Sequence, residues 1–133
     1  MTRRTLILSL VFVTLAGLAS DVFSYPQGLK RCKVLSKQLT LRKGQKQKLT
    51  GTALNGGTVE YHIRTNSKVS ADIRLTADAR LKMDIYLVDP PTVIVRNTNQ
   101  WSGQFEEYKE YTLIVNNCSS KIPFKYRIDL TTR

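Results

Sequence analysis

The residues of this chain that are able to perform chemistry are few and scattered. The one histidine, His62, lies on the polar side of an alternating segment, without a second histidine or a spare thiol to build a catalytic or metal-binding set. The acidic cluster Glu106, Glu107 and Glu110 borders a lysine, which is typical of a solvated loop. No glycine-rich loop that would cradle a phosphate is present. We therefore expect a protein that is not an enzyme, with no catalytic residues, no metal and no cofactor.

The two cysteines, Cys32 and Cys118, lie far apart in the sequence and lack the close spacing of a redox or metal pair. In an exported protein such a pair is most simply one disulfide. Closing so long a loop stabilises the fold by about 4–5 kcal/mol in the chain-entropy description. The sequence therefore predicts a Cys32–Cys118 bridge.

A basic segment runs from residue 30 to residue 48 without an acid. Its cations are Lys30, Arg31, Lys33, Lys37, Arg42, Lys43, Lys46 and Lys48. They either protect an exposed edge strand from aggregation or dock onto an anionic polymer. No aromatic residues alternate with these cations, so we expect no nucleic acid as a partner.

The only tryptophan, Trp101, lies in the polar stretch 97–103, which we interpret as a loop between two strands. Two roles are open to it. An exposed tryptophan among amide side chains is suited to anchoring a partner. Alternatively, the ring folds back and closes one open end of the fold.

These residues must be positioned by strands, because apolar and polar residues alternate with a period of two along most of the chain. The alternation predicts strands over 34–41, 46–54, 59–64, 69–76, 81–88, 111–115 and 124–130. Turn sequences separate them, as at Lys43-Gly44 and Asn55-Gly56. We expect an all-β fold, a single antiparallel β-sandwich of jelly-roll type with about seven or eight strands and one disulfide.

The N-terminal residues 1–24 have the pattern of a secretory signal peptide, with Arg3-Arg4, an apolar run over 6–18 and small residues after it. Cleavage fits after Ala19 or after Ser24. The apolar run is shorter than the roughly 20 residues of a membrane span, so no transmembrane segment is expected. We divide the rest into a leader with the basic first strand (25–38) and the β-sandwich domain (39–133), in a secreted or periplasmic protein.

Charge is the strongest compositional feature: 21 Lys and Arg face 10 Asp and Glu, a formal net charge of +11. Residues 1–24 hold two of these cations and one acid, so cleavage would leave about +10. A charge of this size favours anionic surfaces, polymers or acidic proteins as partners, and it does not select a fold.

The order of several short motifs resembles a secreted β-sandwich family, that of bacterial pre-peptidase C-terminal domains and periplasmic inhibitors of goose-type lysozyme. The motifs are Leu39-Thr40-Leu41-Arg42-Lys43-Gly44-Gln45, Tyr86-Leu87-Val88-Asp89-Pro90, Trp101-Ser102-Gly103, Tyr111-Thr112-Leu113-Ile114-Val115 and Tyr126-Arg127-Ile128-Asp129-Leu130. One position departs from the family pattern, because Tyr108-Lys109-Glu110 stands where a serine-glycine pair usually precedes the penultimate strand.

The resemblance implies an exported binding protein that inhibits a lysozyme or another envelope-active enzyme through loops at one end of the sandwich. The contact residues would then be Trp101, Glu106, Glu107, Tyr108 and Glu110. The alternative, from composition, is a module that binds an anionic envelope glycan or lipid through the basic segment Lys30 to Lys48. A steep loss of affinity with added salt would distinguish the second function from the first.

Overall fold

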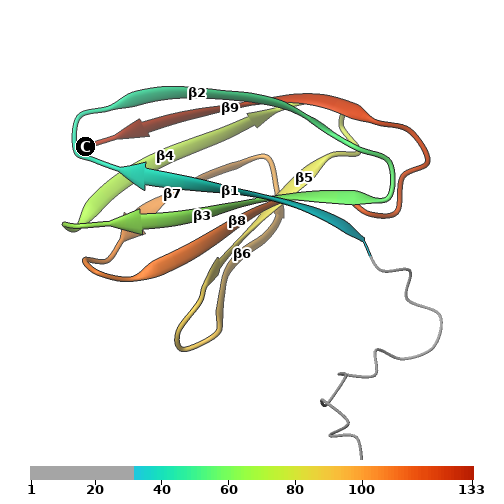
Figure 1. Cartoon of the computed structure of the whole chain (residues 1–133). Coiled ribbons are helices and arrows are strands. Elements are labelled where there is room, and N and C mark those ends of the chain that lie inside the picture. The colour runs from blue at the N-terminus through green and yellow to red at the C-terminus, as the bar shows by residue number, and fades with distance from the viewer. Residues whose placement is uncertain (1–31) are drawn as a thin grey trace, which may run out of the picture. The chain divides into compact units, whose positions relative to one another are not determined.

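The computed structural model describes residues 32–133, which form nine β-strands (Figure 1). In this part of the chain there is no helix long and apolar enough to cross a bilayer. The strands are β1 Lys33–Leu41, β2 Lys46–Ala53, β3 Gly57–Thr65, β4 Val69–Thr76, β5 Lys82–Leu87, β6 Thr92–Thr98, β7 Gln100–Phe105, β8 Glu110–Asn117 and β9 Phe124–Thr132. The predicted signal peptide, the predicted leader up to residue 31, and the cations Lys30 and Arg31 lie outside the described residues.

The strands form two stacked sheets, as the all-β sandwich prediction requires. A five-stranded sheet has the order β1-β3-β8-β5-β6, and a four-stranded sheet has the order β2-β9-β4-β7. Within the described chain, only the β5–β6 turn joins neighbours in one sheet, and every other connection crosses between the sheets. All pairs are antiparallel except β1 and β3, which run parallel from Lys33↔Gly57 to Leu41↔Thr65.

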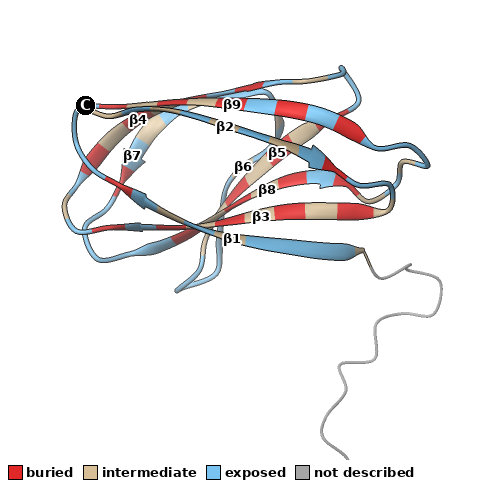
Figure 2. Ribbon diagram, turned by 45° about the horizontal axis from the view of Figure 1, so that its top comes forward, coloured by how far each residue is buried: buried red, intermediate tan, exposed pale blue. Residues whose placement is uncertain are grey.

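The core forms because each alternating segment turns its apolar side chains toward the other sheet. Figure 2 shows the result as buried residues that alternate with less buried ones along the strands. In β3 every second residue, from Gly57 to Thr65, is buried. The largest fully enclosed side chains come from both sheets and include Ile63, Ile73, Met83, Ile85, Phe105, Leu113 and Ile128. Five predicted segments between 59 and 130 are confirmed as strands that share this interior.

The predicted disulfide is confirmed: Cys32 and Cys118 are bonded, with their Cα atoms 5.3 Å apart. The bridge ties the residue before β1 to the residue after β8, across 86 positions of sequence.

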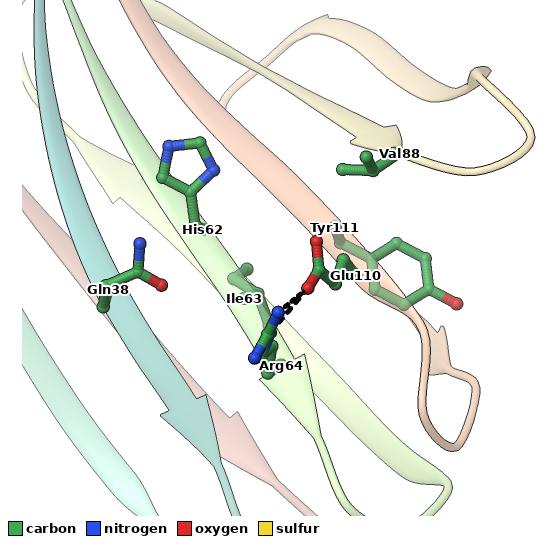
Figure 3. Close-up of a pocket in the computed structure, with 7 residues that line it drawn as sticks. All are labelled: Gln38, His62, Ile63, Arg64, Val88, Glu110 and Tyr111. Carbon is green, nitrogen blue, oxygen red and sulfur yellow. Dashed lines mark hydrogen bonds and ion pairs between the residues drawn. The ribbon is translucent and has the colours of Figure 1, made fainter.

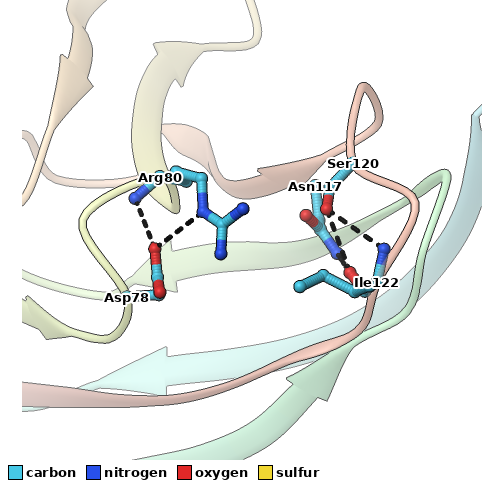
Figure 4. A network of polar contacts seen from close by, with 5 residues as sticks. All are labelled: Asp78, Arg80, Asn117, Ser120 and Ile122. Atoms are coloured by element: carbon cyan, nitrogen blue, oxygen red, sulfur yellow. Dashed lines mark hydrogen bonds and ion pairs between the residues drawn. The ribbon is translucent and has the colours of Figure 1, made fainter.

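Beside the disulfide, Asn117 is buried and closes this end of the sandwich (Figure 4). Its Nδ2 lies 3.0 Å from the carbonyl oxygen of Ala53, 3.1 Å from that of Leu54 and 2.9 Å from that of Ile122. One amide group therefore joins the turn after β2 to the turn before β9.

The interpretation of residues 97–103 as a loop is wrong. Strands β6 and β7 occupy this region, and only Asn99 separates them. Both are edge strands, β6 of the five-stranded sheet and β7 of the four-stranded sheet. An edge strand with a solvated face needs few apolar residues, so the polar composition of this stretch concealed β7 and the end of β6.

Candidate functional site

One end of the sandwich collects four turns that are distant in sequence. The parallel strands β1 and β3 both end there, and β8 begins there opposite β3, in the pair Arg64↔Glu110. The turns are 42–45, 66–68, 88–91 and 106–109. The basic turn after β1 and the acidic loop before β8 thus lie at the same end, which we call the loop end.

The acidic loop is held in place by three hydrogen bonds. The amide of Tyr108 donates to the carbonyl oxygen of Thr65 (3.1 Å), and the Thr65 hydroxyl donates to the carbonyl oxygen of Glu106 (2.9 Å). The amide of Glu106 donates to the buried Tyr111 hydroxyl (2.9 Å). These bonds anchor the backbone at Glu106 and at Tyr108 itself. The loop is therefore preorganised by residues of the neighbouring strands β3 and β8.

Tyr108 itself projects from the loop. It is 79% exposed, more than any other large apolar side chain in the described residues. Its φ is +57°, in the left-handed region that costs a non-glycine residue about 1–3 kcal/mol. The ring therefore contributes nothing to the core, although its backbone conformation is costly.

The acids of the loop are not equivalent. Glu110 forms an ion pair with Arg64, and its Oε1 accepts from the Arg64 Nε at 2.6 Å. Glu106 lies 3.9 Å from the ammonium of Lys68. Glu107 has no ion pair within the described part of the chain. Among residues 32–133, Tyr108 is therefore flanked by an unpaired acid, Glu107, and an unpaired cation, Lys109.

Two shallow hollows flank the Arg64–Glu110 pair. The first, of about 170 Å³, is lined by Gln38, His62, Ile63, Val88 and Tyr111 together with the pair (Figure 3). The second, of about 250 Å³, is lined by Thr65, Asn66, Tyr108 and Lys109 with the pair. Both are smaller than the roughly 300–1,000 Å³ of ordinary small-molecule sites. The Tyr108 ring lines the second hollow, and a projecting ring beside so small a hollow suits a macromolecular contact.

His62 lies in the first hollow, where Figure 3 shows it beside Gln38 and away from the ion pair. Its Nε2 is 3.7 Å from the carboxylate of Glu60. Among residues 32–133, no three His, Cys, Asp or Glu side chains come together as metal ligands would.

Trp101 lies in β7 and packs inward, on the same side of the strand as Phe105. The two ring centroids are 5.2 Å apart, and Phe105 meets the Tyr111 ring edge-on at 4.7 Å. Trp101 is half-buried, and it lies near the start of β7 while the acidic loop follows the end of that strand. The structure brings Glu106, Glu107, Tyr108 and Glu110 together and leaves Trp101 apart.

The basic segment does not form one patch. Lys33 begins β1 at the end of the sandwich opposite the loop end, and Lys37 lies 5.7 Å from the Tyr61 ring centre. Arg42 and Lys43 lie at the loop end, in the turn between β1 and β2. Lys46 and Lys48 belong to β2, on the outer face of the four-stranded sheet.

Reasoning from sequence identified the acidic loop but missed the residues that support it. Arg64 and Thr65 end β3, and Lys68 precedes β4. Nothing in the local sequence pairs them with residues 106–110, because the contact arises from strand pairing across about 45 positions. The available signal was weak: Arg64 continues the polar side of a predicted strand toward a turn.

The sequence matches no protein-family model, and no curated protein matches it. Solved structures are similar to it. The g-type lysozyme inhibitor PliG of Aeromonas hydrophila, a periplasmic protein, aligns with a TM-score of 0.62 at 10% identity, over 77% of this chain and 100% of that one.

Two further structures align with lower scores. The periplasmic g-type lysozyme inhibitor PliG of Salmonella Typhimurium has a TM-score of 0.47 at 11% identity, over 77% of this chain and 100% of that one. The pre-peptidase C-terminal domain of a Bacillus anthracis collagenase has a TM-score of 0.47 at 17% identity, over 78% and 99%. The resemblance drawn from the motif order is confirmed as a likeness of fold.

Proposed function

We propose that this protein is an exported, non-catalytic binding protein that inhibits an envelope-active enzyme of the g-type lysozyme class. Loop 106–109 is the segment that contacts the target. The observation that carries the proposal is Tyr108, an aromatic side chain held out from the fold on strained but well-anchored backbone. The likeness in fold to the Aeromonas inhibitor supports the choice of target class.

The physical basis of inhibition is a rigid projection that fills a concave site. Because hydrogen bonds with Thr65 and Tyr111 already order the loop, little conformational entropy is lost on binding. Tyrosine offers a large contact area with few rotatable bonds, which is why it is frequent among binding hot spots. Glu107 adds a negative charge beside the ring, while Glu106 and Glu110 are occupied in supporting the loop.

Export is part of the proposal. Thiols are kept reduced in the cytosol, and the signal peptide predicted over residues 1–24 would direct the chain out of it. The Cys32–Cys118 bridge is of the kind that persists in an oxidising compartment outside the cytosol. A periplasm or an external fluid both meet this condition.

Inhibition of a purified goose-type lysozyme by the oxidised protein tests the proposal. Replacing Tyr108 with glycine should raise the inhibition constant about 30-fold or more, since a hot-spot side chain contributes about 2 kcal/mol or more. The same variant should be no less stable in urea, and up to about 1 kcal/mol more stable, because glycine accepts a positive φ.

The matched control is Leu54→Ala, which removes an exposed apolar side chain at the opposite end of the sandwich. It should leave inhibition unchanged. A wild-type protein that inhibits no lysozyme, or a Tyr108→Gly variant that inhibits as well as the wild type, would refute the proposal. Inhibition should also persist at high salt, because the main contact is not ionic.

A further inference from the structure

The outer face of the four-stranded sheet collects cations from three strands. Alternation places one set of side chains of β2, β9 and β4 outward, opposite the buried set. The outward cations, which together define the basic face, are Lys46, Lys48, Arg74, Lys125 and Arg127. The acids on the same side are Asp72 and Asp129.

Most of this positive charge is uncompensated. Arg127 pairs with Asp129 at 3.0 Å, and the C-terminal Arg133 pairs with Asp72 at 2.8 Å. The other four cations of the basic face have no ion pair within the described part of the chain; they are Lys46, Lys48, Arg74 and Lys125.

The outer face of the other sheet is balanced by comparison. Its outward acids are Glu60, Asp84 and Glu110. They are matched by Arg64 and Lys82, and by Arg96, whose guanidinium lies 5.8 Å from the Tyr86 ring. The charge surplus of the described chain is therefore not spread evenly over the sandwich, and one face carries much of it.

The cations of the basic face stand in rows at strand spacing. Successive outward residues of one strand are about 7 Å apart, and neighbouring strands are about 5 Å apart. The register sets Lys48 opposite Asp129 and Thr52 opposite Lys125. Charges thus recur along an extended surface rather than around a single point.

Two open hollows lie on this face, and both have hydroxyl groups beside cations. One, of about 460 Å³, is lined by Arg74, Gln100, Ser102 and Thr131 together with Asp72 and Asp129, whose carboxylates pair with Arg133 and Arg127. The other, of about 500 Å³, includes Thr50, Thr52, Thr76, Lys125 and Arg127. Neutral donors and acceptors beside cations can bind a polymer that carries hydroxyl groups as well as negative charge.

We propose that the basic face binds a linear anionic polysaccharide, one bearing carboxylate or sulfate groups. Cations meet the acidic groups, and the threonine, serine and glutamine side chains meet the sugar hydroxyls. No outward position of β2, β4, β7 or β9 carries an aromatic ring on which a base would stack. None of the exposed large apolar side chains lies on these strands, so this face has no apolar side chains to insert into a lipid bilayer.

This site is separate from loop 106–109. It uses the outer face of the four-stranded sheet, whereas the loop joins β7 to β8 at the loop end, and the two share no residue. Of the basic segment, the basic face contains only Lys46 and Lys48, and its other cations come from β4 and β9. A protein with both sites would be retained on an anionic glycan with its Tyr108 loop free.

The test compares the wild-type protein with the triple variant Lys46→Gln, Lys48→Gln, Lys125→Gln. A control variant carries Lys33→Gln, Lys82→Gln and Lys121→Gln and has the same net charge. Binding is measured to heparin and to alginate at several salt concentrations. The face variant should lose about tenfold or more in affinity at low salt, and its salt dependence should be shallower, because fewer counterions are released. The control should stay within about twofold of the wild type.

Other outcomes decide against the proposal. Equal losses in both triple variants would show that net charge, and not this face, governs binding. Tighter binding of single-stranded oligothymidylate or of phosphatidylglycerol vesicles than of either glycan would assign a different partner. Lysozyme inhibition should be unchanged in the face variant, so a failure here is distinguishable from a failure of the loop proposal.

Discussion

The hydroxyl oxygens of Tyr61 and Tyr126 lie 2.6 Å apart in the interior, and their hydrogen bond joins the two sheets. Tyr61 belongs to β3 and Tyr126 to β9. Gly51 of β2 pairs with Tyr126, and a side chain there would come within 2.6 Å of the Tyr126 hydroxyl. The glycine therefore leaves the space in which the two tyrosines meet.

The losses of stability from removing these two hydroxyls should not be additive. Tyr61→Phe or Tyr126→Phe leaves a buried hydroxyl without its partner, and we expect a loss of about 1–3 kcal/mol in the free energy of unfolding. The double variant should lose less than the sum, with a coupling near 1 kcal/mol. Urea denaturation of the four proteins measures this. Tyr86→Phe is the control, since its hydroxyl lies on the outer side of β5, half-buried and 3.3 Å from Asp84; additive losses would contradict the coupling.

The same pair predicts a loss of stability in alkali. Burial, and then the hydrogen bond with Tyr61, raises the pKa of Tyr126 far above its usual value of 10.0. Above about pH 10 the unfolded chain releases this proton while the folded chain keeps it, so stability falls as pH rises. The slope from this group approaches about 1.4 kcal/mol per pH unit. In Tyr126→Phe the fall should be shallower by that amount, measured by urea denaturation from pH 9 upward; an unchanged slope would refute the assignment.

Asn117 should be among the polar residues least tolerant of change. Asn117→Asp places a carboxylate against three carbonyl oxygens in a buried position, and we expect a loss of about 3 kcal/mol or more. Asn116→Asp is the matched control, because its Oδ1 accepts from the Cys118 amide and a carboxylate keeps that role. Thermal or urea unfolding distinguishes them. Similar stabilities for the two variants would contradict the bonding seen at this end of the sandwich.

Gly103 should control the position of Trp101. A Cβ at Gly103 would overlap the Trp101 ring, so Gly103→Ala must displace the ring from Phe105. We expect a loss of about 1–3 kcal/mol and a red shift of tryptophan emission, which reports on this ring alone because the chain has one tryptophan. Gln104→Ala, an exposed position in the same strand, should leave the emission unchanged. An unshifted spectrum in Gly103→Ala would contradict the packing.

Several elements could be predicted because their pattern is local. The segment 59–64 alternates strictly, and burial of one face is enough to make it a strand. Gly44 and Gly56 have φ of +74° and +66°, at turns where the sequence led us to expect breaks. Strands β6 and β7 were not predicted, because a solvated edge imposes no apolar alternation.

The candidate sites also depend on strand pairing that local sequence patterns do not reveal. The acidic loop was recognisable from its composition, but its support by Thr65, and the separation of Trp101 from it, depend on which strands pair. The basic segment was evident as a run of charge. The cations of this segment do not share one surface. Lys46 and Lys48 lie on the same face as Lys125 and Arg127 because β2 pairs with β9.

The sequence by itself determined the class of fold and the disulfide, because two-residue periodicity and an isolated cysteine pair are properties of the chain read in order. Only the tertiary structure decided which charges share a surface and that Tyr108 projects on strained backbone. The physical reason is that successive strands here alternate between the sheets, so almost every neighbour that matters is distant in sequence. Contacts of that kind are fixed by packing of the whole core and leave no local trace.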